Sequence, residues 1–200
     1  MGLGYGAGVP THVALLRGIN VGGRNKVAMA DLRAVVTSLG HADVATYIQS
    51  GNVVFTARAT DSALLAADLA ADLEAAIAQA LDVRPRVVVV SREELAQVVR
   101  DTPYSAEANP KSVHAVFLGE YPAAEMVDHV ADAQRQARLK GSRDAAQYVG
   151  RILFLHTPDG FGRSELAVLL ARPGGPTSVR GAGTARNWAT VTRLLAMCEA

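Results

Sequence analysis

The sequence alternates between short apolar runs and longer segments of helical periodicity, and the same order of segments occurs twice. Apolar runs closed by glycine or proline are typical of strands, whereas apolar residues spaced three or four apart are typical of helices. Each half is predicted to run strand, helix, strand, strand, helix, strand. This order indicates a ferredoxin-like fold, in which two helices cover one face of an antiparallel sheet.

The first half carries the clearer pattern. A leucine or isoleucine stands at every fourth position from Leu65 to Leu81, which predicts a long amphipathic helix. A shorter helix is expected from Met29 to Leu39, where Gly40 ends it. The strands are expected over residues 12–19, 44–50, 52–57 and 87–90, with a tight turn at Ser50 and Gly51.

The second half repeats this order from Val113 onward. Strands are expected over residues 113–118, 147–149 and 151–156 and near Thr177 to Arg180. Three helices are expected in this half: one begins at Pro122, one is capped by Ser164 and one is capped by Thr184. Trp188, Val191 and Leu195 share one face of the last of these helices. We therefore predict an α+β protein of two ferredoxin-like (βαββαβ) subdomains, with helices packed on one face of each antiparallel sheet.

The predicted domain organisation has four parts. Residues 1–11 form a disordered N-terminus, residues 12–90 the first subdomain and residues 113–200 the second subdomain with a C-terminal helix. Residues 91–112 form a connecting helix and linker. Ser91 and Glu94 have the spacing of a capping box at the start of that helix.

Composition excludes several classes of protein. The 20 basic and 19 acidic residues give a net charge of +1, so any attraction to anions must be local. The single cysteine, Cys198, excludes an internal disulfide and a cysteine-based metal cluster. The chain has neither a signal peptide pattern nor an apolar run of membrane-spanning length. These features predict a cytoplasmic monomer or weak homodimer that does not bind membranes.

The segment LLRGINVGGRNKVAMADLR places glycines and cations between the first strand and the first helix. The spacing from Gly18 to Gly23 resembles a nucleoside-triphosphate loop, but Arg24 and Asn25 replace its lysine and hydroxyl, so we exclude a standard ATPase. Backbone amides at such a junction can bind an anion. The alternative is that the glycines only satisfy turn geometry and the cations are solvated.

The candidate anion site extends beyond this loop. The hairpin segment YIQSGNVVF offers polar side chains, and the segment GTARNWATV offers an arginine and an asparagine beside Trp188. Trp188 itself is predicted to be core. The site comprises Arg17, Gly18, Asn20, Gly22, Gly23, Arg24 and Lys26, with Gln49, Ser50 and Asn52 from the hairpin and Arg186 and Asn187 from the later segment.

A second candidate loop lies in the segment HTPDGFGRSEL, where Gly160, Gly162 and Arg163 precede Ser164. As in the first loop, exposed backbone amides at a helix start lie beside a guanidinium, and such a group of donors can bind an anion. A turn followed by a helix cap is the favoured interpretation, because capping alone accounts for the glycines and the serine, and Asp159 adds a negative charge that opposes anion binding.

Four blocks of the sequence resemble a bacterial family called domain of unknown function 1697. They are LLRGINVGGRNKVAMADLR, TYIQSGNVVF, GRILFLHTPDGFGRSEL and TARNWATVTRLL, and the resemblance runs from His12 to Met197. It implies a pair of ferredoxin-like subdomains and no established activity. Ala28 and Ala189 depart from the family, whose members often have proline and asparagine at these positions.

The function predicted from these residues is the binding of a phosphate-bearing ligand, either a nucleotide or a nucleic acid held by loops. The five histidines lack metal-ligand spacing, so no metal or cofactor is expected. No catalytic residue can be assigned, because no activated pair is evident. Two alternatives remain open: an enzyme acting on a small phosphorylated or carboxylated metabolite, and an interaction or scaffold protein without a ligand site.

Overall fold

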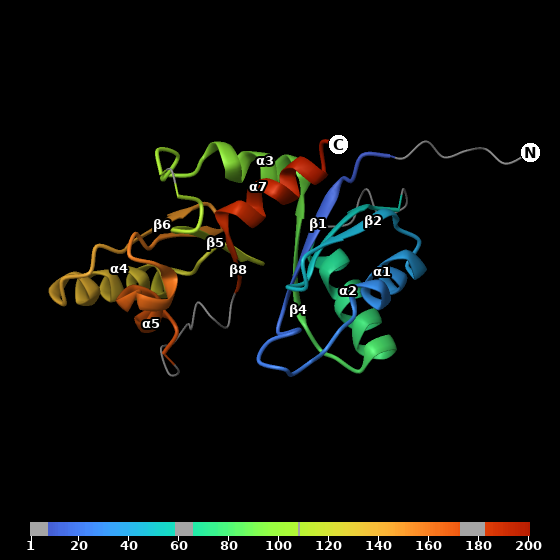
Figure 1. The fold of residues 1–200 in the computed structure, drawn as a ribbon, viewed down its shortest axis with the longest axis horizontal. Coiled ribbons are helices and arrows are strands. Elements are labelled where there is room, and N and C mark those ends of the chain that lie inside the picture. The colour runs from blue at the N-terminus through green and yellow to red at the C-terminus, as the bar shows by residue number, and fades with distance from the viewer. Residues whose placement is uncertain (1–7, 59–65, 108, 173–182) are drawn as a thin grey trace, which may run out of the picture. The chain divides into compact units, whose positions relative to one another are not determined.

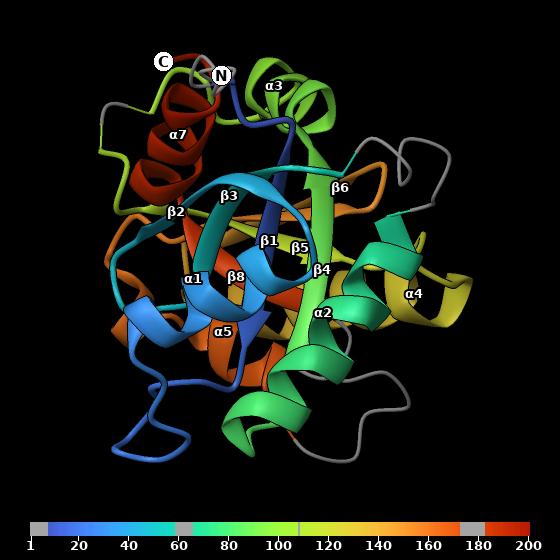
Figure 2. The ribbon, with the colours of Figure 1, turned by 90° about the vertical axis from the view of Figure 1, so that its right-hand side faces the viewer.

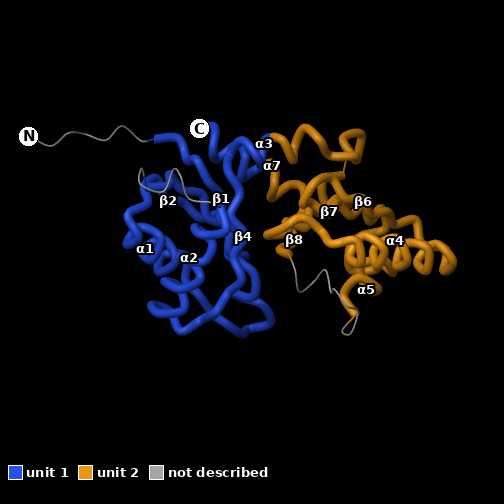
Figure 3. The backbone as a smooth tube through the Cα atoms, turned by 180° about the vertical axis from the view of Figure 1, so that it is seen from behind, with its two compact units in different colours: residues 1–96, 193–200 blue, residues 97–192 orange. Residues whose placement is uncertain are grey.

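The computed structural model describes residues 8–58, 66–107, 109–172 and 183–200 of the 200-residue chain. The chain divides into two compact units, shown in different colours in Figure 3. Unit 1 comprises Met1–Ala96 and Arg193–Ala200, and unit 2 comprises Gln97–Thr192.

Unit 1 contains a four-stranded antiparallel sheet in the order β2-β3-β1-β4. Central strand β1 pairs with β3 on one side and with β4 on the other. The elements are β1 (His12–Arg17), α1 (Met29–Ser38), β2 (Ala42–Tyr47), β3 (Asn52–Thr56), α2 (Ala66–Leu81) and β4 (Arg86–Ser91), after which α3 (Arg92–Arg100) begins.

Helices α1 and α2 lie on one face of this sheet (Figures 1 and 2). Their buried residues include Leu32, Leu69 and Ile77, which share one apolar cluster with Leu16 of β1 and Phe55 of β3. Since burial of apolar area is the main favourable contribution to folding, this cluster accounts for the position of both helices.

Unit 2 repeats the arrangement, with a sheet in the order β6-β7-β5-β8. Met126 and Val130 of α4 and Leu166 of α5 pack in one cluster with Leu153 and Leu155 of β7. The elements are β5 (Val113–Leu118), α4 (Ala124–Leu139), β6 (Ala145–Val149), β7 (Ile152–His156), the 3-10 turn η2 (Phe161–Arg163), α5 (Glu165–Leu170) and β8 (Gly183–Asn187), followed by α7 (Trp188–Met197).

The predicted fold class is confirmed, since the chain forms two four-stranded antiparallel sheets with helices in βαββαβ order. Two predicted caps are also present. The Ser91 Oγ accepts a hydrogen bond from the Glu94 amide at 3.0 Å, and a Glu94 carboxylate oxygen accepts one from the Ser91 amide at 3.0 Å. The Ser164 Oγ accepts the Ala167 amide at 2.9 Å.

The prediction that Thr184 caps the last helix is wrong. Thr184 lies within β8, opposite Phe117 of β5, and Asn187 caps α7 by accepting the Thr190 amide at 2.9 Å. Edge strand β8 has the sequence GTARN, which lacks the apolar run by which the other strands were found. The strand predicted near Thr177 to Arg180 falls outside the described residues.

The hairpin between β2 and β3 is wider than the predicted turn at Ser50 and Gly51. Strand pairing ends at Tyr47 and Asn52, and residues 48–51 form the loop between them. Ile48 has a φ of 50°, which is unusual for a β-branched residue and ends the strand.

The ends of the chain differ from the predicted organisation. Of the N-terminus predicted to be disordered, residues 1–7 fall outside the described residues. Thr11 is ordered by the sheet, since its amide donates to the Phe55 carbonyl at 3.0 Å and its carbonyl accepts the Arg92 amide at 2.8 Å. The last residues, Arg193–Ala200, group with unit 1, whereas the prediction assigned them to the second subdomain. Among the described residues, no helix combines the length and apolar character that a membrane span needs.

Candidate functional site

Three connections of unit 1 lie at the same end of its sheet, because β1 ends where β3 and β4 begin. They are residues 18–28, 48–51 and 82–85. Figures 1 and 2 show the first and third of these below the sheet, at the end from which α1 starts. Most of the predicted anion site is therefore gathered at one end of unit 1.

Gly22 and Gly23 form the tip of a small hairpin within the first connection. The Arg24 amide donates to the Val21 carbonyl at 3.0 Å, and the two glycines have φ values of 58° and 76°. Positive φ at both central positions defines a type I′ turn, which glycine adopts without strain. Turn geometry thus accounts for both glycines, and their contact with an anion stays a prediction.

Asn20 fastens this connection to the rest of unit 1. Its side-chain amide donates to the Val27 carbonyl at 2.9 Å and to the Gln49 carbonyl at 3.0 Å, and its oxygen accepts the Val27 amide at 2.8 Å. The Asn25 side chain adds a bond to the Gly18 carbonyl at 2.7 Å. Asn20 and Asn25 therefore hold the loop backbone in place.

Exposed cations gather at this end of unit 1. Arg24 and Lys26 are exposed, and neither forms an ion pair with another residue that the structure describes. Arg84 is exposed in the third connection, and the Arg86 side chain is 79% exposed, with its Nε 3.9 Å from a Glu74 oxygen. We call Arg24, Lys26, Arg84 and Arg86 the cationic end.

Arg17 lies beside the cationic end as a half-buried residue. It ends β1 directly opposite Arg86 of β4. Three acidic side chains lie nearby. Glu74 has an oxygen 3.9 Å from the Arg86 Nε, and that oxygen accepts the Val87 amide at 2.7 Å. Asp31 lies in the first turn of α1, and Asp82 is exposed in the third connection. Arg84 and Arg86 were not among the site residues predicted from the sequence. In a ferredoxin-like sheet the fourth strand starts beside the end of the first strand. This expected pairing was the signal from which both arginines could have been predicted.

The start of α1 lacks a side-chain cap. Its N-cap residue, Ala28, has extended backbone angles and offers no hydrogen-bonding side chain to the first turn. The amides of a first helical turn have no partner within the helix and carry the positive end of the helix dipole. The first-turn amides of α1 therefore have no capping side chain.

The hairpin residues of the predicted site brace the loop itself. The Asn52 side chain is fully buried and donates to the Tyr47 carbonyl at 3.0 Å and to the Ser50 Oγ at 2.9 Å. Gln49 and Ser50 are exposed at the loop surface. Of these residues, only Gln49 and Ser50 are accessible enough to meet a ligand.

The second candidate loop belongs to unit 2 and is held by internal bonds. Ser164 is buried, caps α5 and donates to an Asp144 oxygen at 2.8 Å. Gly160 has a φ of 94° before the turn η2, whereas Gly162 and Arg163 are exposed. The guanidinium of Arg143 bonds Asp159 and lowers the pKa of that carboxyl.

Arg186 and Asn187 end β8 in unit 2. Arg186 is only 9% exposed, and its Nη1 donates to the Ala185 carbonyl at 2.8 Å. Burial lowers the pKa of the Arg186 guanidinium to about 10. Asn187 serves as the cap of α7, so its side-chain oxygen already has a structural role.

The other reactive groups that the structure describes do not form a recognisable catalytic set. Burial raises the pKa of the Cys198 thiol to about 11 and that of the Tyr148 hydroxyl to about 12, so both are protonated near neutral pH. His156 Nε2 lies 2.7 Å from a Glu107 oxygen, which ties the linker before β5 to β7. Within the described ranges, no group of three or more His, Cys, Asp or Glu residues could hold a metal ion.

The fold and the site together define an α+β protein of two ferredoxin-like units, of which unit 1 carries the cationic end. The chain belongs to the family described as "Protein of unknown function (DUF1697)", whose sequence profile matches residues 9–148. The family resemblance stated from the sequence is thereby confirmed.

One solved structure with the same fold is that of the conserved bacterial protein SP0830 from Streptococcus pneumoniae. It is 25% identical in sequence and has a TM-score of 0.67, over 94% of this chain and 98% of that chain. No curated protein matches the chain. These similarities support the fold and assign no activity.

Proposed function

We propose that unit 1 binds a phosphate-bearing ligand at the cationic end. The observation that carries the proposal is that Arg24, Lys26, Arg84 and Arg86 are exposed at one end of one sheet, in a chain whose net charge is only +1. A local concentration of cations on a nearly neutral protein attracts anions selectively to that place.

The surrounding backbone supports the same proposal. The uncapped first turn of α1 presents amides at the positive end of a helix dipole, beside the cationic loop. Asn20 fixes the loop before any ligand arrives, which lowers the entropy that binding must remove. Arginine is suited to phosphate because its guanidinium donates two parallel hydrogen bonds.

Binding is favoured over catalysis because the cationic end has no nucleophile paired with a base in the part of unit 1 that the structure describes. The Ser50 hydroxyl, in the connection formed by residues 48–51, accepts a bond from Asn52 within the hairpin. A cytoplasmic location and a monomeric or weakly dimeric state are further proposals from the sequence.

A thermal-shift screen with inorganic pyrophosphate, nucleotides and phosphosugars at two salt concentrations tests the proposal. A ligand at 100 times its Kd stabilises the native state by about 2.7 kcal/mol. We expect stabilisation at low salt that weakens at high salt and is lost in Arg24→Ala/Lys26→Ala. The matched control is Arg135→Ala/Arg172→Ala, which removes two exposed arginines of unit 2 and the same charge. Equal shifts in both variants would contradict the proposal.

A further inference from the structure

The four cations of the cationic end come from separate stretches of chain and are all exposed. Arg24 and Lys26 lie in the connection after β1, whereas Arg84 and Arg86 lie before and at the start of β4. Pockets for small ligands bury roughly 70–90% of the ligand surface. Exposed cations on separate connections are better suited to a long polyanion, which gains affinity from several phosphate contacts and the release of counterions.

The composition of the three connections distinguishes between polyanions. Residues 18–28, 48–51 and 82–85 contain no aromatic residue. Proteins that bind single-stranded nucleic acid stack its bases on aromatic side chains, and membrane-surface segments commonly insert aromatic or leucine residues. Cations with neighbouring polar side chains, such as Gln49, favour the sugar-phosphate backbone of a duplex.

The shape of the first connection favours the B form of a duplex. Val21 and Arg24 form an isolated antiparallel bridge, and the tip between them consists of Gly22 and Gly23. The major groove of B-DNA, about 12 Å wide, admits a two-stranded β-ribbon, whereas that of A-form RNA is too narrow. A hairpin whose tip has no side chains is slender enough to enter the wider groove.

We infer that the ligand of the cationic end is double-stranded DNA, bound through its phosphate backbone with the Val21–Arg24 hairpin in the major groove. The inference rests on the proposed function, because it specifies the phosphate-bearing ligand of the same site. Backbone contacts carry no base sequence, so binding is nonspecific in sequence.

The experiment measures fluorescence anisotropy of a labelled DNA duplex of about 20 base pairs over a series of salt concentrations. Competitors are the single strand of the same sequence, the RNA duplex of the same sequence, AMP, inorganic pyrophosphate and vesicles of phosphatidylserine and phosphatidylcholine. The proteins are the full chain, Arg24→Ala/Lys26→Ala, Arg84→Ala/Arg86→Ala and the control Arg135→Ala/Arg172→Ala. Circular dichroism establishes that each variant is folded.

Four phosphate contacts predict a slope of log K against log salt of about −3.6 for the full chain. Each cationic-end variant loses two contacts and is expected to show about −1.8, while the control keeps the slope of the full chain. The DNA duplex is expected to bind more tightly than every competitor.

Each other outcome has a defined meaning. If AMP or pyrophosphate competes as well as the duplex, the ligand is a small phosphate compound; the inference fails and the proposed function stands. If the single strand, the RNA duplex or the vesicles bind as tightly as the DNA duplex, the inference also fails. If no phosphate-bearing probe binds, both the inference and the proposed function fail.

Discussion

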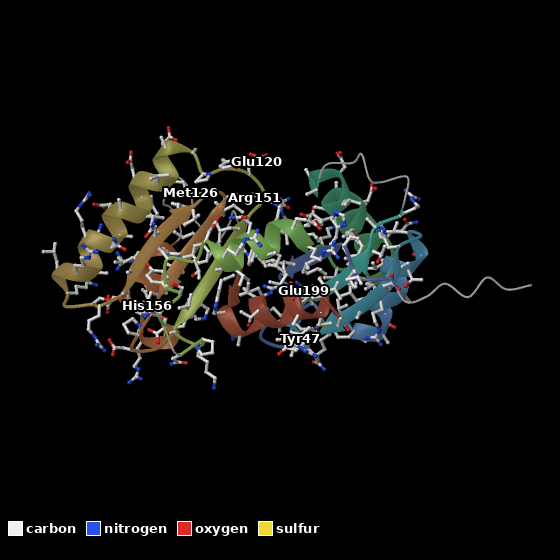
Figure 4. The ribbon with its side chains drawn as sticks, turned by 90° about the horizontal axis from the view of Figure 1, so that it is seen from above. Tyr47, Glu120, Met126, Arg151, His156 and Glu199 are labelled. Atoms are coloured by element: carbon white, nitrogen blue, oxygen red, sulfur yellow. The ribbon has the colours of Figure 1, made fainter. Side chains whose placement is uncertain are left out.

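The two units have the same sheet order but differ in the connection between their first strand and first helix. In unit 1, residues 18–28 form a braced hairpin with Arg24 and Lys26 exposed. In unit 2, residues 119–123 make the same connection and carry exposed Glu120, which is labelled in Figure 4. The Arg151 Nη1 donates to the carbonyl of the preceding residue, Gly119, at 3.4 Å. The sheet is thus the shared framework, and the cationic end is specific to unit 1 within the described residues.

Strand register makes the duplication visible at single positions. Leu16 and Leu118 are equivalent, since the Leu16 amide donates to the Gly51 carbonyl at 2.8 Å and the Leu118 amide to the Arg151 carbonyl at 3.1 Å. By the same register His12 corresponds to His114, and Ser91 corresponds to Asn187. Ser91 and Asn187 each cap the helix that follows the edge strand.

The largest expected difference between the units lies at their hairpin glycines. A Cβ on Gly51 would lie 2.8 Å from the Leu16 Cβ and 3.0 Å from the Ile19 Cδ1, at a φ of 76°. Gly51→Ala therefore combines overpacking with backbone strain, and we expect it to lower the free energy of unfolding by about 2–5 kcal/mol. Urea denaturation followed by circular dichroism measures the change.

The comparison variant is Gly150→Ala, at the glycine of the β6–β7 hairpin in unit 2. Gly150 has a φ of 57°, but its Cβ would meet nothing closer than a Tyr121 carbon at 4.0 Å. The expected loss is about 1 kcal/mol, from backbone strain alone. The fluorescence of Trp188, whose ring lies 5.9 Å from that of Phe154, reports on unit 2. Equal losses of unfolding free energy in Gly51→Ala and Gly150→Ala would contradict the conclusion that only Gly51 is closely packed.

The next largest effect on stability is expected from the side-chain hydrogen bonds that hold residues 18–28 of unit 1 in place. Asn20→Ala removes three hydrogen bonds and is expected to lower the free energy of unfolding by about 2 kcal/mol. Asn25→Ala removes one side-chain bond and should lower it by about 1 kcal/mol. The Val27 amide donates a hydrogen bond to the Asn20 side-chain oxygen, so the hydrogen-exchange rate of this amide measures local opening of the connection. Unchanged exchange in Asn20→Ala would contradict the bracing role.

The helix starts offer a test that separates stability from binding. α1 and α4 both begin after an alanine, Ala28 and Ala123, with no side-chain cap. Ala28→Asp and Ala123→Asp should each stabilise the protein by about 0.5–1 kcal/mol in thermal unfolding, because aspartate caps a helix well. Only Ala28→Asp should also weaken phosphate binding, since it puts a negative charge beside the cationic end. Weaker binding in both variants would argue against a unit-specific site.

The smallest expected effect concerns pH. Burial lowers the pKa of both His12 and His114, but for His12 the carboxylates of Glu93 and Glu94 oppose it. A histidine whose folded pKa lies below 6.5 stabilises the native state fully above pH 6.5, and this stabilisation is lost as pH falls through the folded value. His114→Phe should therefore reduce the loss of Tm on acidification below pH 6.5 more than His12→Phe does.

The sequence predicted the architecture because buried strands and helices leave clear periodicities. It missed β8, because that edge strand has polar residues at alternate positions and its pairing is made by backbone groups opposite β5. It proposed Arg24 and Lys26 from local charge, and the structure shows that both are exposed. Arg84 and Arg86 escaped notice because their proximity to that loop depends on strand pairing between distant segments.

Unit 1 is discontinuous in the chain, and this bears on how the protein is made. Leu194 and Cys198 are buried in the segment Arg193–Ala200, which groups with unit 1 although residues 97–192 intervene. A ribosome adds about 5–20 residues per second, so the intervening stretch delays these side chains by roughly 5–20 s. Unit 2 can therefore be synthesised completely before the nascent polypeptide holds every residue that unit 1 requires.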